Sequence, residues 1–381
     1  MSAHEHLFTE QFGYSDELQT YFCPGRVNLI GEHIDYLGGL VLPTAISLGI
    51  TAVYRPNTSN LIRLCSTDFE GVSTFDLAEL PNSKQSHWTD FVLGVILHLR
   101  QNNIAISGGD ILFSSTLPKA SGLSSSAALE VLCYYLFHQT STGEEPNRIQ
   151  MAIECQKIEN EFIGVNCGIM DQFAVANGKV NQALMLDCNS VTCDFVPLNL
   201  GAYSLLIINS NKPRTLAESA YNQRRKECDL ALNMISNSRP IKNLVDAKEE
   251  DLKLLSGDIR KRTKHAYTEQ LRVQESGVAL GESNLEHFAS LMTESHISLR
   301  DDFEVSCTEL DFIVNRLNES EYCLGARMTG AGFGGCCITL VVDRQSETLQ
   351  SKLEVAYENR FGFKPSFYSV TPSDGVHKVK L

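Results

Sequence analysis

The 381-residue sequence lacks any apolar run long enough to span a bilayer, and it has no internal repeat or low-complexity tract. Positive charge is also scarce, since 32 lysines and arginines stand against 46 acidic residues and leave a formal net charge of −14. Nucleic acids and anionic membranes need a basic face, so we expect neither as a partner. The first twenty residues lack the basic start and apolar core of a signal peptide. We therefore expect a cytoplasmic protein.

Closely spaced pairs of metal-ligating cysteines are absent as well. The twelve cysteines are scattered from Cys23 to Cys337 with no C-x-x-C spacing. Structural zinc sites need such pairs, and a disulfide framework is typical of short secreted chains rather than of a chain this long. We expect reduced thiols, most of them in the core.

Strand patterns and helix patterns alternate through the chain, which predicts an α+β or α/β protein. Apolar alternation or short apolar runs predict strands at 46–54, 110–116, 204–210 and 336–342. Helical patterns are found at 146–164, from about 216, around 285–292 and around 307–317. The polar stretch 237–264 carries charge runs of opposite sign and is interpreted as a solvated helical face or connector. The length predicts two domains, and we expect the boundary between them near residues 190–200.

The stretch GLSSSA (122–127) follows a predicted strand and opens a predicted helix. Its glycine turn and helix N-terminus aim free backbone N–H groups at one point, where the helix dipole favours an anion. The hydroxyls of Ser124, Ser125 and Ser126 can add to these donors or bind magnesium. The stretch is not a Walker loop, because the terminal Lys-Ser/Thr is missing. A plain helix N-cap is the alternative.

Two further stretches hold candidate chemistry. In GIMDQF (168–173), Asp171 is an acid within an apolar run, which is costly unless it is paired. Arg26, in the turn-like PGR stretch, is a candidate partner, and a helix-capping aspartate is the alternative. The glycines of MTGAGFGG (328–335) let a backbone approach a ligand or another strand closely. Phosphoryl transfer needs these parts: positioning, charge neutralisation and a base.

Four motifs, in this order, resemble the signatures of galactokinase in the GHMP kinase superfamily: PGRVNLIGEHIDY, GLSSSAALE, CGIMDQF and MTGAGFGG. The resemblance extends from about Tyr21 to Gly335. It implies an α+β protein of two lobes, with ATP and galactose in the cleft between them. The N-terminal lobe, residues 1–195, would be ribosomal-protein-S5-like, and the C-terminal lobe, residues 196–381, would be ferredoxin-like.

The resemblance also implies roles for individual residues. Asp171 would take the proton of the C1 hydroxyl, while Arg26 would keep Asp171 ionised and stabilise the transferring phosphoryl group. Carboxylates and an imidazole suit a polyol, whose hydroxyls both donate and accept hydrogen bonds. The residues implied to bind galactose are Glu32, His33, Ile34, Asp35, Gly168 and Tyr221. Ile34 stands where the family usually has threonine, and its side chain is expected to point away from the sugar.

The implied ATP site comprises Ser66, Ala120, Ser121, Gly122, Leu123, Ser124, Ser125 and Ser126. Magnesium would be bound by Ser126 and Glu159, with phosphate and water completing its coordination. Alanine disfavours the positive φ that glycine permits, so Ala120, where the family usually has glycine, is expected to alter nucleotide affinity slightly. Trp88 would lie near the adenine, although core packing explains it equally well.

The implied reaction converts ATP and α-D-galactose into ADP and galactose 1-phosphate in a monomeric cytoplasmic enzyme. Two alternatives stay open at this point: an N-acetylgalactosamine kinase, and a non-catalytic sensor of galactose and ATP on the same fold. The complete set of Arg26, Asp171, Ser126 and Glu159 favours the enzyme over the sensor, because a sensor needs to bind its ligands but needs no base.

Overall fold

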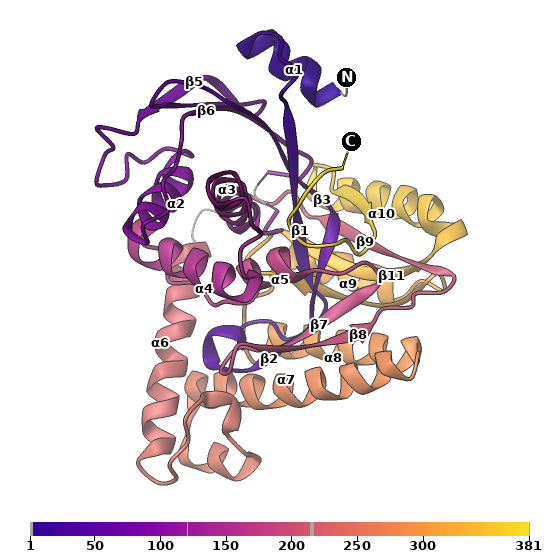
Figure 1. The fold of residues 1–381 in the computed structure, drawn as a ribbon. Coiled ribbons are helices and arrows are strands. Elements are labelled where there is room, and N and C mark those ends of the chain that lie inside the picture. The colour runs from indigo at the N-terminus through magenta and orange to yellow at the C-terminus, as the bar shows by residue number, and fades with distance from the viewer. Residues whose placement is uncertain (1–2, 120, 214–216, 381) are drawn as a thin grey trace.

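The structure is a computed structural model that describes residues 3–119, 121–213 and 217–380. Its strands form three sheets with helices packed around them, and both chain ends lie at the top of the view in Figure 1. The mixture of largely antiparallel sheets with separate helices confirms the predicted α+β class.

The largest sheet has the strand order β13-β1-β3-β6-β4-β5, with neighbours antiparallel except for the parallel pair β4 and β6. Its strands are β1 (Gln19–Asn28), β3 (Pro43–Pro56), β4 (Leu61–Ser66), β5 (Phe69–Asp76), β6 (Gly109–Ser115) and β13 (His377–Lys378). The strands predicted at 46–54 and 110–116 are confirmed as β3 and β6. The PGR stretch is not a turn: the register between β1 and β3 shifts between Pro24 and Gly25, so it is an irregularity within β1 that redirects Arg26.

The two smaller sheets have the orders β10-β11-β9-β12 and β2-β7-β8, and all their neighbours are antiparallel. Their strands are β2 (Leu40–Val41), β7 (Gln182–Asp187), β8 (Thr192–Pro197), β9 (Tyr203–Asn209), β10 (Cys323–Thr329), β11 (Cys336–Val342) and β12 (Ser366–Val370). The strands predicted at 204–210 and 336–342 are thus confirmed as β9 and β11, which lie side by side in the four-stranded sheet.

Helices α7 and α8 run along each other in the lower half of Figure 1, where α7 contacts β2 and β8 and α8 contacts β10. The α-helices are α1 (Ala3–Phe12), α2 (Asp90–Gln101), α3 (Ser125–Thr142), α4 (Arg148–Ile158), α5 (Met170–Asn177), α6 (Ala217–Ser236), α7 (Gly257–Gly281), α8 (Leu285–Asp301), α9 (Thr308–Asn318) and α10 (Ser346–Phe361). Short 3₁₀ helices are η1 (Asp35–Leu37), η3 (Leu244–Asp246), η4 (Glu249–Leu254) and η5 (Asp343–Gln345), and η2 (Glu159–Ile163) is a π-helix. The predicted helices are confirmed, and Gly164 ends α4 and η2 in a left-handed conformation.

The charged stretch 237–264 is not simply solvated. Leu244 and Leu252 are buried in its two 3₁₀ helices, and Arg262 is 1% exposed near the start of α7. The guanidinium of Arg262 donates to the carboxylates of Glu227 and Glu304 at 2.7 Å each. A buried charge is tolerated when it is paired in this way. Arg262 therefore has a structural role in a stretch whose pattern indicated a surface connector.

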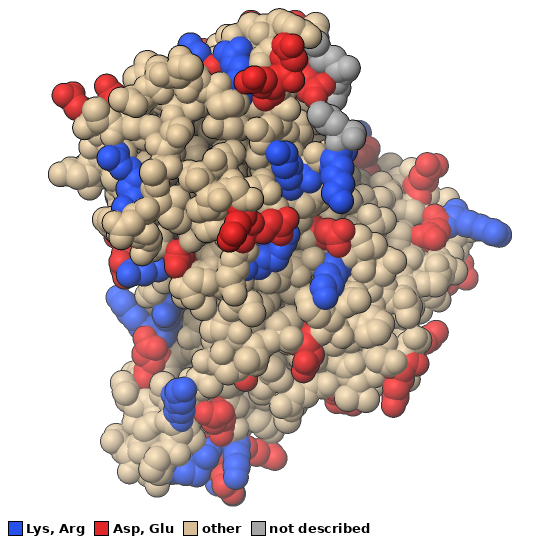
Figure 2. All heavy atoms as spheres, viewed as in Figure 1, with Lys and Arg blue, Asp and Glu red and all other residues tan. Residues whose placement is uncertain are grey.

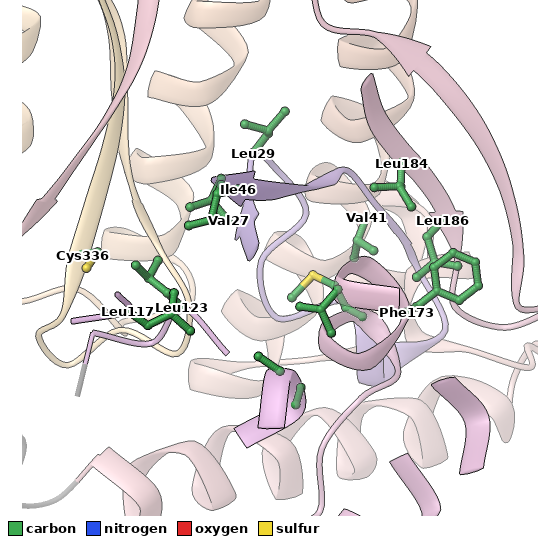
Figure 3. Packing of buried hydrophobic residues seen from close by; sticks show 14 of the residues in the cluster. Val27, Leu29, Val41, Ile46, Leu117, Leu123, Phe173, Leu184, Leu186 and Cys336 are labelled. Carbon is green, nitrogen blue, oxygen red and sulfur yellow. The ribbon is translucent and has the colours of Figure 1, made fainter. Parts of the chain in front are cut away.

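One hydrophobic cluster extends through both halves of the chain. It joins Val27 and Ile46 of the large sheet, Phe173 of α5 and Cys336 of β11. Figure 3 shows these side chains together with others of the cluster. All twelve cysteines are free thiols, as expected. Because the cluster is continuous, it holds residues from distant parts of the chain at fixed positions relative to one another.

The surface carries both signs of charge. On the face drawn in Figure 2, lysines and arginines are interspersed with aspartates and glutamates and do not form a single basic field. A nucleic acid or an anionic membrane would need such a field. Within the described ranges, no helix combines the length and apolar character that crossing a membrane requires.

Candidate active site

Two pockets lie near the start of α3. The smaller has a volume of about 130 Å³ and is lined by seven predicted site residues: Arg26, Glu32, His33, Asp35, Gly168, Asp171 and Tyr221. The larger has a volume of about 450 Å³, and its walls include Ser66, Trp88, Ser125 and Ser126. Ser124 contacts Asp171 of the smaller pocket while its two neighbours line the larger one. The serine stretch therefore lies between the pockets.

Arg26 and Asp171 form a two-point ion pair at the wall of the smaller pocket. The Nε of Arg26 donates to Asp171 Oδ1 at 2.9 Å, and Nη2 donates to Oδ2 at 2.8 Å. The third guanidinium nitrogen, Nη1, donates to the carbonyl of Gly122 at 2.7 Å. The predicted pairing is confirmed, and it fixes the guanidinium plane because a forked donor meets a forked acceptor. Asp171 retains 30% exposure of its side chain towards the pocket, against 6% for Arg26.

Ser124 does not act as a side-chain helix cap. It occupies the N-cap position of α3 with a left-handed φ of 64°, and its side chain makes no capping hydrogen bond. Its hydroxyl instead donates to Asp171 Oδ2 at 2.5 Å. The simple capping interpretation of GLSSSA is therefore wrong for Ser124. The left-handed backbone turns this side chain towards the carboxylate and the next two serines towards the larger pocket.

The other residues of the predicted nucleotide loop differ in their surroundings. Ser121 is buried and its hydroxyl donates to the carbonyl of Pro118 at 2.7 Å. The side chain of Leu123 belongs to the hydrophobic core, and its carbonyl accepts the backbone N–H of Arg26 at 3.3 Å. Ala120, whose effect on nucleotide affinity was predicted, lies outside the described residues.

Glu32 connects the first motif with the glycine-rich motif of the C-terminal half. Its Oε1 accepts the Thr329 hydroxyl at 2.9 Å and the Gly330 backbone N–H at 2.8 Å. Arg327 Nη2 lies 3.3 Å from the same oxygen. Two stretches separated by about three hundred residues are thus joined at one buried carboxylate. This contact explains part of the glycine-rich sequence, because Gly330 presents its N–H from a left-handed backbone with a φ of 83°, which favours glycine.

His33 is a neutral histidine with both ring nitrogens in use. Its Nε2 lies 3.2 Å from the carbonyl of Ala331, which can only accept, so Nε2 carries the proton. Its Nδ1 then accepts the Tyr36 hydroxyl at 2.9 Å. Burial, followed by the charge of the neighbouring His265, lowers the pKa of His33 to about 3. The imidazole therefore shapes the pocket wall together with Tyr36 and Tyr221, whose rings pack around it.

Asp35 presents a carboxylate to the pocket from the start of η1. Burial, followed by the charge of Asp171, raises the pKa of Asp35 to about 7. Gly168 is its close neighbour, because a Cβ built at Gly168 would lie only 1.9 Å from Asp35 Oδ2. The side chain of Ile34 is fully buried in the core and does not line the pocket, which agrees with the expectation that it points away.

The contact between Gly168 and Asp35 gives a steric prediction. In Gly168→Ala the added methyl group must displace the Asp35 carboxylate, since its Cγ would also lie within 2.6 Å. We expect the galactose KM to rise by about tenfold or more, while the ATP KM changes less than twofold, as displacing one polar contact predicts. The control is Gly281→Ala at the end of α7, where a Cβ meets no atom within 4 Å and the backbone is not left-handed. Unchanged galactose kinetics in Gly168→Ala would show that Asp35 does not touch the sugar.

Ser126 lines the larger pocket, and Glu159 lies within hydrogen-bonding reach of Ser126. Glu159 is 7% exposed in η2, and its Oε2 accepts Gln172 Nε2 at 2.5 Å. Burial and then the charge of Asp171 raise the pKa of Glu159 to about 7, while a hydrogen bond from Ser126 acts in the opposite direction. Within the described ranges, no group of three or more histidine, cysteine, aspartate and glutamate residues could hold a metal by itself. A cation here would need oxygens from a phosphate, as magnesium usually does.

Three neighbours of the site were not identified from the sequence. Tyr36 binds His33, Gln172 binds Glu159, and Glu130 is a fully buried carboxyl on α3. Burial and the nearby charge of Glu159 raise the pKa of Glu130 well above its ordinary value. Glu130 could have been found by the argument applied to Asp171, because it too is an acid within an apolar run. Tyr36 and Gln172 carry no comparable signal.

Comparison with known proteins shows the family of the chain. Three family models match the chain: "Galactokinase galactose-binding signature" at residues 6–56, "GHMP kinases N terminal domain" at 90–179 and "GHMP kinases C terminal" at 278–359. A galactokinase of Clostridium beijerinckii is 41% identical over 380 residues, which cover 98% of this chain and 97% of the relative. A galactokinase of Bacillus subtilis is 39% identical over 382 residues, which cover 98% of each chain.

Solved structures agree with these relatives. The crystal structure of Lactococcus lactis galactokinase complexed with galactose matches with a TM-score of 0.94 and 38% identity over 98% of both chains. A mevalonate kinase structure matches with a TM-score of 0.68 at 21% identity, which shows a shared fold alone. The fold and the paired arginine and carboxylate beside a serine-rich helix start define a GHMP kinase, the fold class that the motifs implied. Within that class, the chain belongs to the galactokinase family.

Proposed function

We propose that the chain transfers the γ-phosphoryl group of ATP to the C1 hydroxyl of α-D-galactose, giving galactose 1-phosphate and ADP. The observation that carries this proposal is the two-point Arg26–Asp171 pair, which lies in the wall of the small pocket and bonds to the serine stretch between the two pockets. A group that accepts a proton and a cation that stabilises phosphoryl charge are thereby held where a sugar and a nucleotide would meet.

In this mechanism Asp171 accepts the proton of the C1 hydroxyl as the oxygen attacks the γ-phosphorus, and the bond to the β-phosphate oxygen breaks. Arg26 is aimed by its three hydrogen bonds and offers positive charge where negative charge spreads over the transferring group. Ser124 keeps the carboxylate oriented, because its hydroxyl donates to one of the two Asp171 oxygens.

The galactose-binding roles follow from the pocket lining. Asp35 and Glu32 supply acceptors for sugar hydroxyls, and Tyr221 and His33 supply the aromatic wall. Glucose differs from galactose in the direction of one hydroxyl, so a pocket of fixed, buried polar groups would leave partners unsatisfied for the wrong epimer. We propose that discrimination arises there and not from the larger pocket, which would hold the nucleotide.

Magnesium is proposed as the cofactor that accompanies ATP. Ser126 and Glu159 would hold it, since a buried carboxylate with a raised pKa next to a hydroxyl is stabilised by a cation. When bound, the ion would neutralise phosphate charge during transfer. Residues 1–195 would form the N-terminal lobe and 196–381 the C-terminal lobe of a monomeric, cytoplasmic enzyme. Two strands depart from this division, because β8 spans the boundary and β13 pairs with β1 in the large sheet.

The raised pKa of Glu159 predicts a pH-dependent magnesium requirement. Metal binds the ionised carboxylate, so protons compete with it as the pH falls through about 7. We expect the magnesium concentration for half-maximal activity to rise below that pH. In Glu159→Gln this magnesium concentration should be about tenfold higher at pH 8 than in the unaltered protein, and it should no longer vary with pH. Galactose affinity without nucleotide should be retained. The control is Glu154→Gln on the preceding helix α4, which should leave the magnesium requirement unchanged. An unaltered requirement in Glu159→Gln would make this residue structural.

The function itself is tested by coupled measurement of ADP release with galactose, glucose, N-acetylgalactosamine and mevalonate. We expect strong preference for galactose and formation of galactose 1-phosphate. Faster turnover of N-acetylgalactosamine would support the alternative sugar kinase. Binding of galactose and ATP with no ADP release from any sugar would support the sensor.

A further inference from the structure

Helix α7 presents two fully buried polar side chains to the first motif. His265 and Glu269 are one helical turn apart, so they lie on the same face, and both have 0% exposure. Neither lines the small or the large pocket, and neither belongs to the sequence motifs of the site. Burying a charged and a polar residue at this position is costly unless both are satisfied by partners.

Their partners are the backbone groups of the motif that forms the pocket. Glu269 Oε1 accepts the backbone N–H of Gly31 at 3.0 Å, and His265 Nε2 lies 3.0 Å from the carbonyl of Glu32. The carboxylate of Glu269 is completed by the Ser295 hydroxyl at 2.6 Å and by Arg272 Nε at 2.8 Å. Two consecutive residues of the motif are therefore each held by one side chain of α7.

The hydrogen-bond direction at His265 is determined by its partners. A carbonyl oxygen can only accept, so Nε2 must carry the proton and Nδ1 must accept from the Ser298 hydroxyl, 2.9 Å away. Burial lowers the pKa of His265 to about 4, so the ring is neutral at physiological pH and keeps this tautomer. His265 is thus a permanent donor to the Glu32 carbonyl.

A third contact, from the ring of Phe303, fixes the position of His33. The ring of Phe303 packs against both His265 and His33, with centroids 4.7 Å and 4.8 Å apart. The Phe303 carbonyl accepts Arg224 Nε at 2.7 Å, which holds this aromatic ring in place from α6. His33 has a left-handed φ of 63°, which is unfavourable for a side chain with a Cβ and persists only where the surroundings impose it.

We propose that His265 and Glu269 are positioning residues for the galactose pocket. They hold the Gly31 and Glu32 peptide units, and with them the left-handed His33, so that the pocket side chains face the sugar before it binds. A backbone fixed in advance loses less conformational freedom on binding, and this increases affinity. The inference rests on the proposed function, because it concerns the same sugar site.

The test compares two substitutions of His265. His265→Gln places an amide N–H near the position of Nε2 and can still donate to the Glu32 carbonyl, whereas His265→Leu fills a similar volume without a donor. The control is His98→Leu on α2, a partly buried histidine bonded to Glu154 and remote from both pocket linings. For each purified full-length variant, the galactose Kd is measured by calorimetry, and kcat and both KM values are measured by ADP release.

We expect the galactose Kd and KM to rise about tenfold in His265→Leu, the upper range for one hydrogen bond. The KM for magnesium ATP should stay within about twofold, and His265→Gln should recover most of the galactose affinity. A role in stability alone would lower the melting temperature in His265→Leu and His98→Leu without changing galactose affinity, and that result would overturn the inference.

Two further outcomes are distinguishable. If His265→Leu does not fold, Ser298→Ala decides, because loss of the hydroxyl that donates to Nδ1 frees the other tautomer and should raise the galactose Kd about threefold. An unchanged Kd in Ser298→Ala would count against the inference. Failure of the unaltered protein to bind galactose would instead overturn the proposed function, and this inference with it, whereas normal binding in His265→Leu would overturn the inference alone.

Discussion

Asp171→Asn is expected to lower kcat by about a hundredfold or more while galactose still binds. The asparagine has nearly the same shape, so the pocket keeps its volume, but it cannot accept the proton of the attacking hydroxyl. Asparagine also replaces one of the two oxygens that receive Arg26, so part of the guanidinium alignment is lost. The measurement is kcat from ADP release together with the galactose Kd from calorimetry.

The control for this variant is Asp110→Asn. Asp110 lies on β6, is fully buried and accepts hydrogen bonds from Arg55 and Arg63. Like Asp171, it is a carboxylate paired with arginine, but it does not line either pocket. We expect Asp110→Asn to lower the melting temperature and leave kcat nearly unchanged. If Asp171→Asn behaved in the same way, the pair would be structural and the assigned base would be wrong.

Arg26→Ala is expected to lower kcat by about 10²–10³-fold, the range seen when a preorganised group that stabilises transferring charge is removed. Without the guanidinium of Arg26, the Asp171 carboxylate keeps the hydrogen bond from Ser124 but has no cation beside it. The Gly122 carbonyl also loses the hydrogen bond that Arg26 donates to it. The control is Arg63→Ala, which removes a two-point arginine–aspartate pair outside both pockets and should leave kcat unaltered.

The double variant separates a shared role from two independent ones. Because Arg26 and Asp171 act through one contact, Asp171→Asn combined with Arg26→Ala should lose little more activity than the worse single variant. Losses that multiply would mean that the two residues contribute separately, and that the two-point pair in the free protein is not the arrangement used in the reaction.

Much of the site could be predicted because its residues sit in contiguous motifs. Arg26 and Asp171 were paired from the sequence on the ground that a charge within an apolar run needs a partner, and the structure confirms that contact. The elements that bear them were not predicted: PGR was interpreted as a turn, whereas Arg26 lies on β1, and no helix was expected at α5, which carries Asp171. For Ser124 the sequence left helix capping and phosphate binding as alternatives. Its hydroxyl instead bonds to Asp171, and this bond depends on a left-handed backbone that no residue preference indicates.

The sequence by itself determined the α+β class, the free thiols, the position of each motif and the family resemblance, since these depend on local pattern and composition. Only the tertiary structure decided how the motifs meet. Glu32 reaches Thr329 and Gly330, and α7 holds the backbone of Gly31, although these partners are more than two hundred residues apart in the chain. Such contacts leave no periodic or compositional signal, because a backbone N–H is present at almost every position and a buried glutamate or histidine resembles a surface one until folding selects its partner.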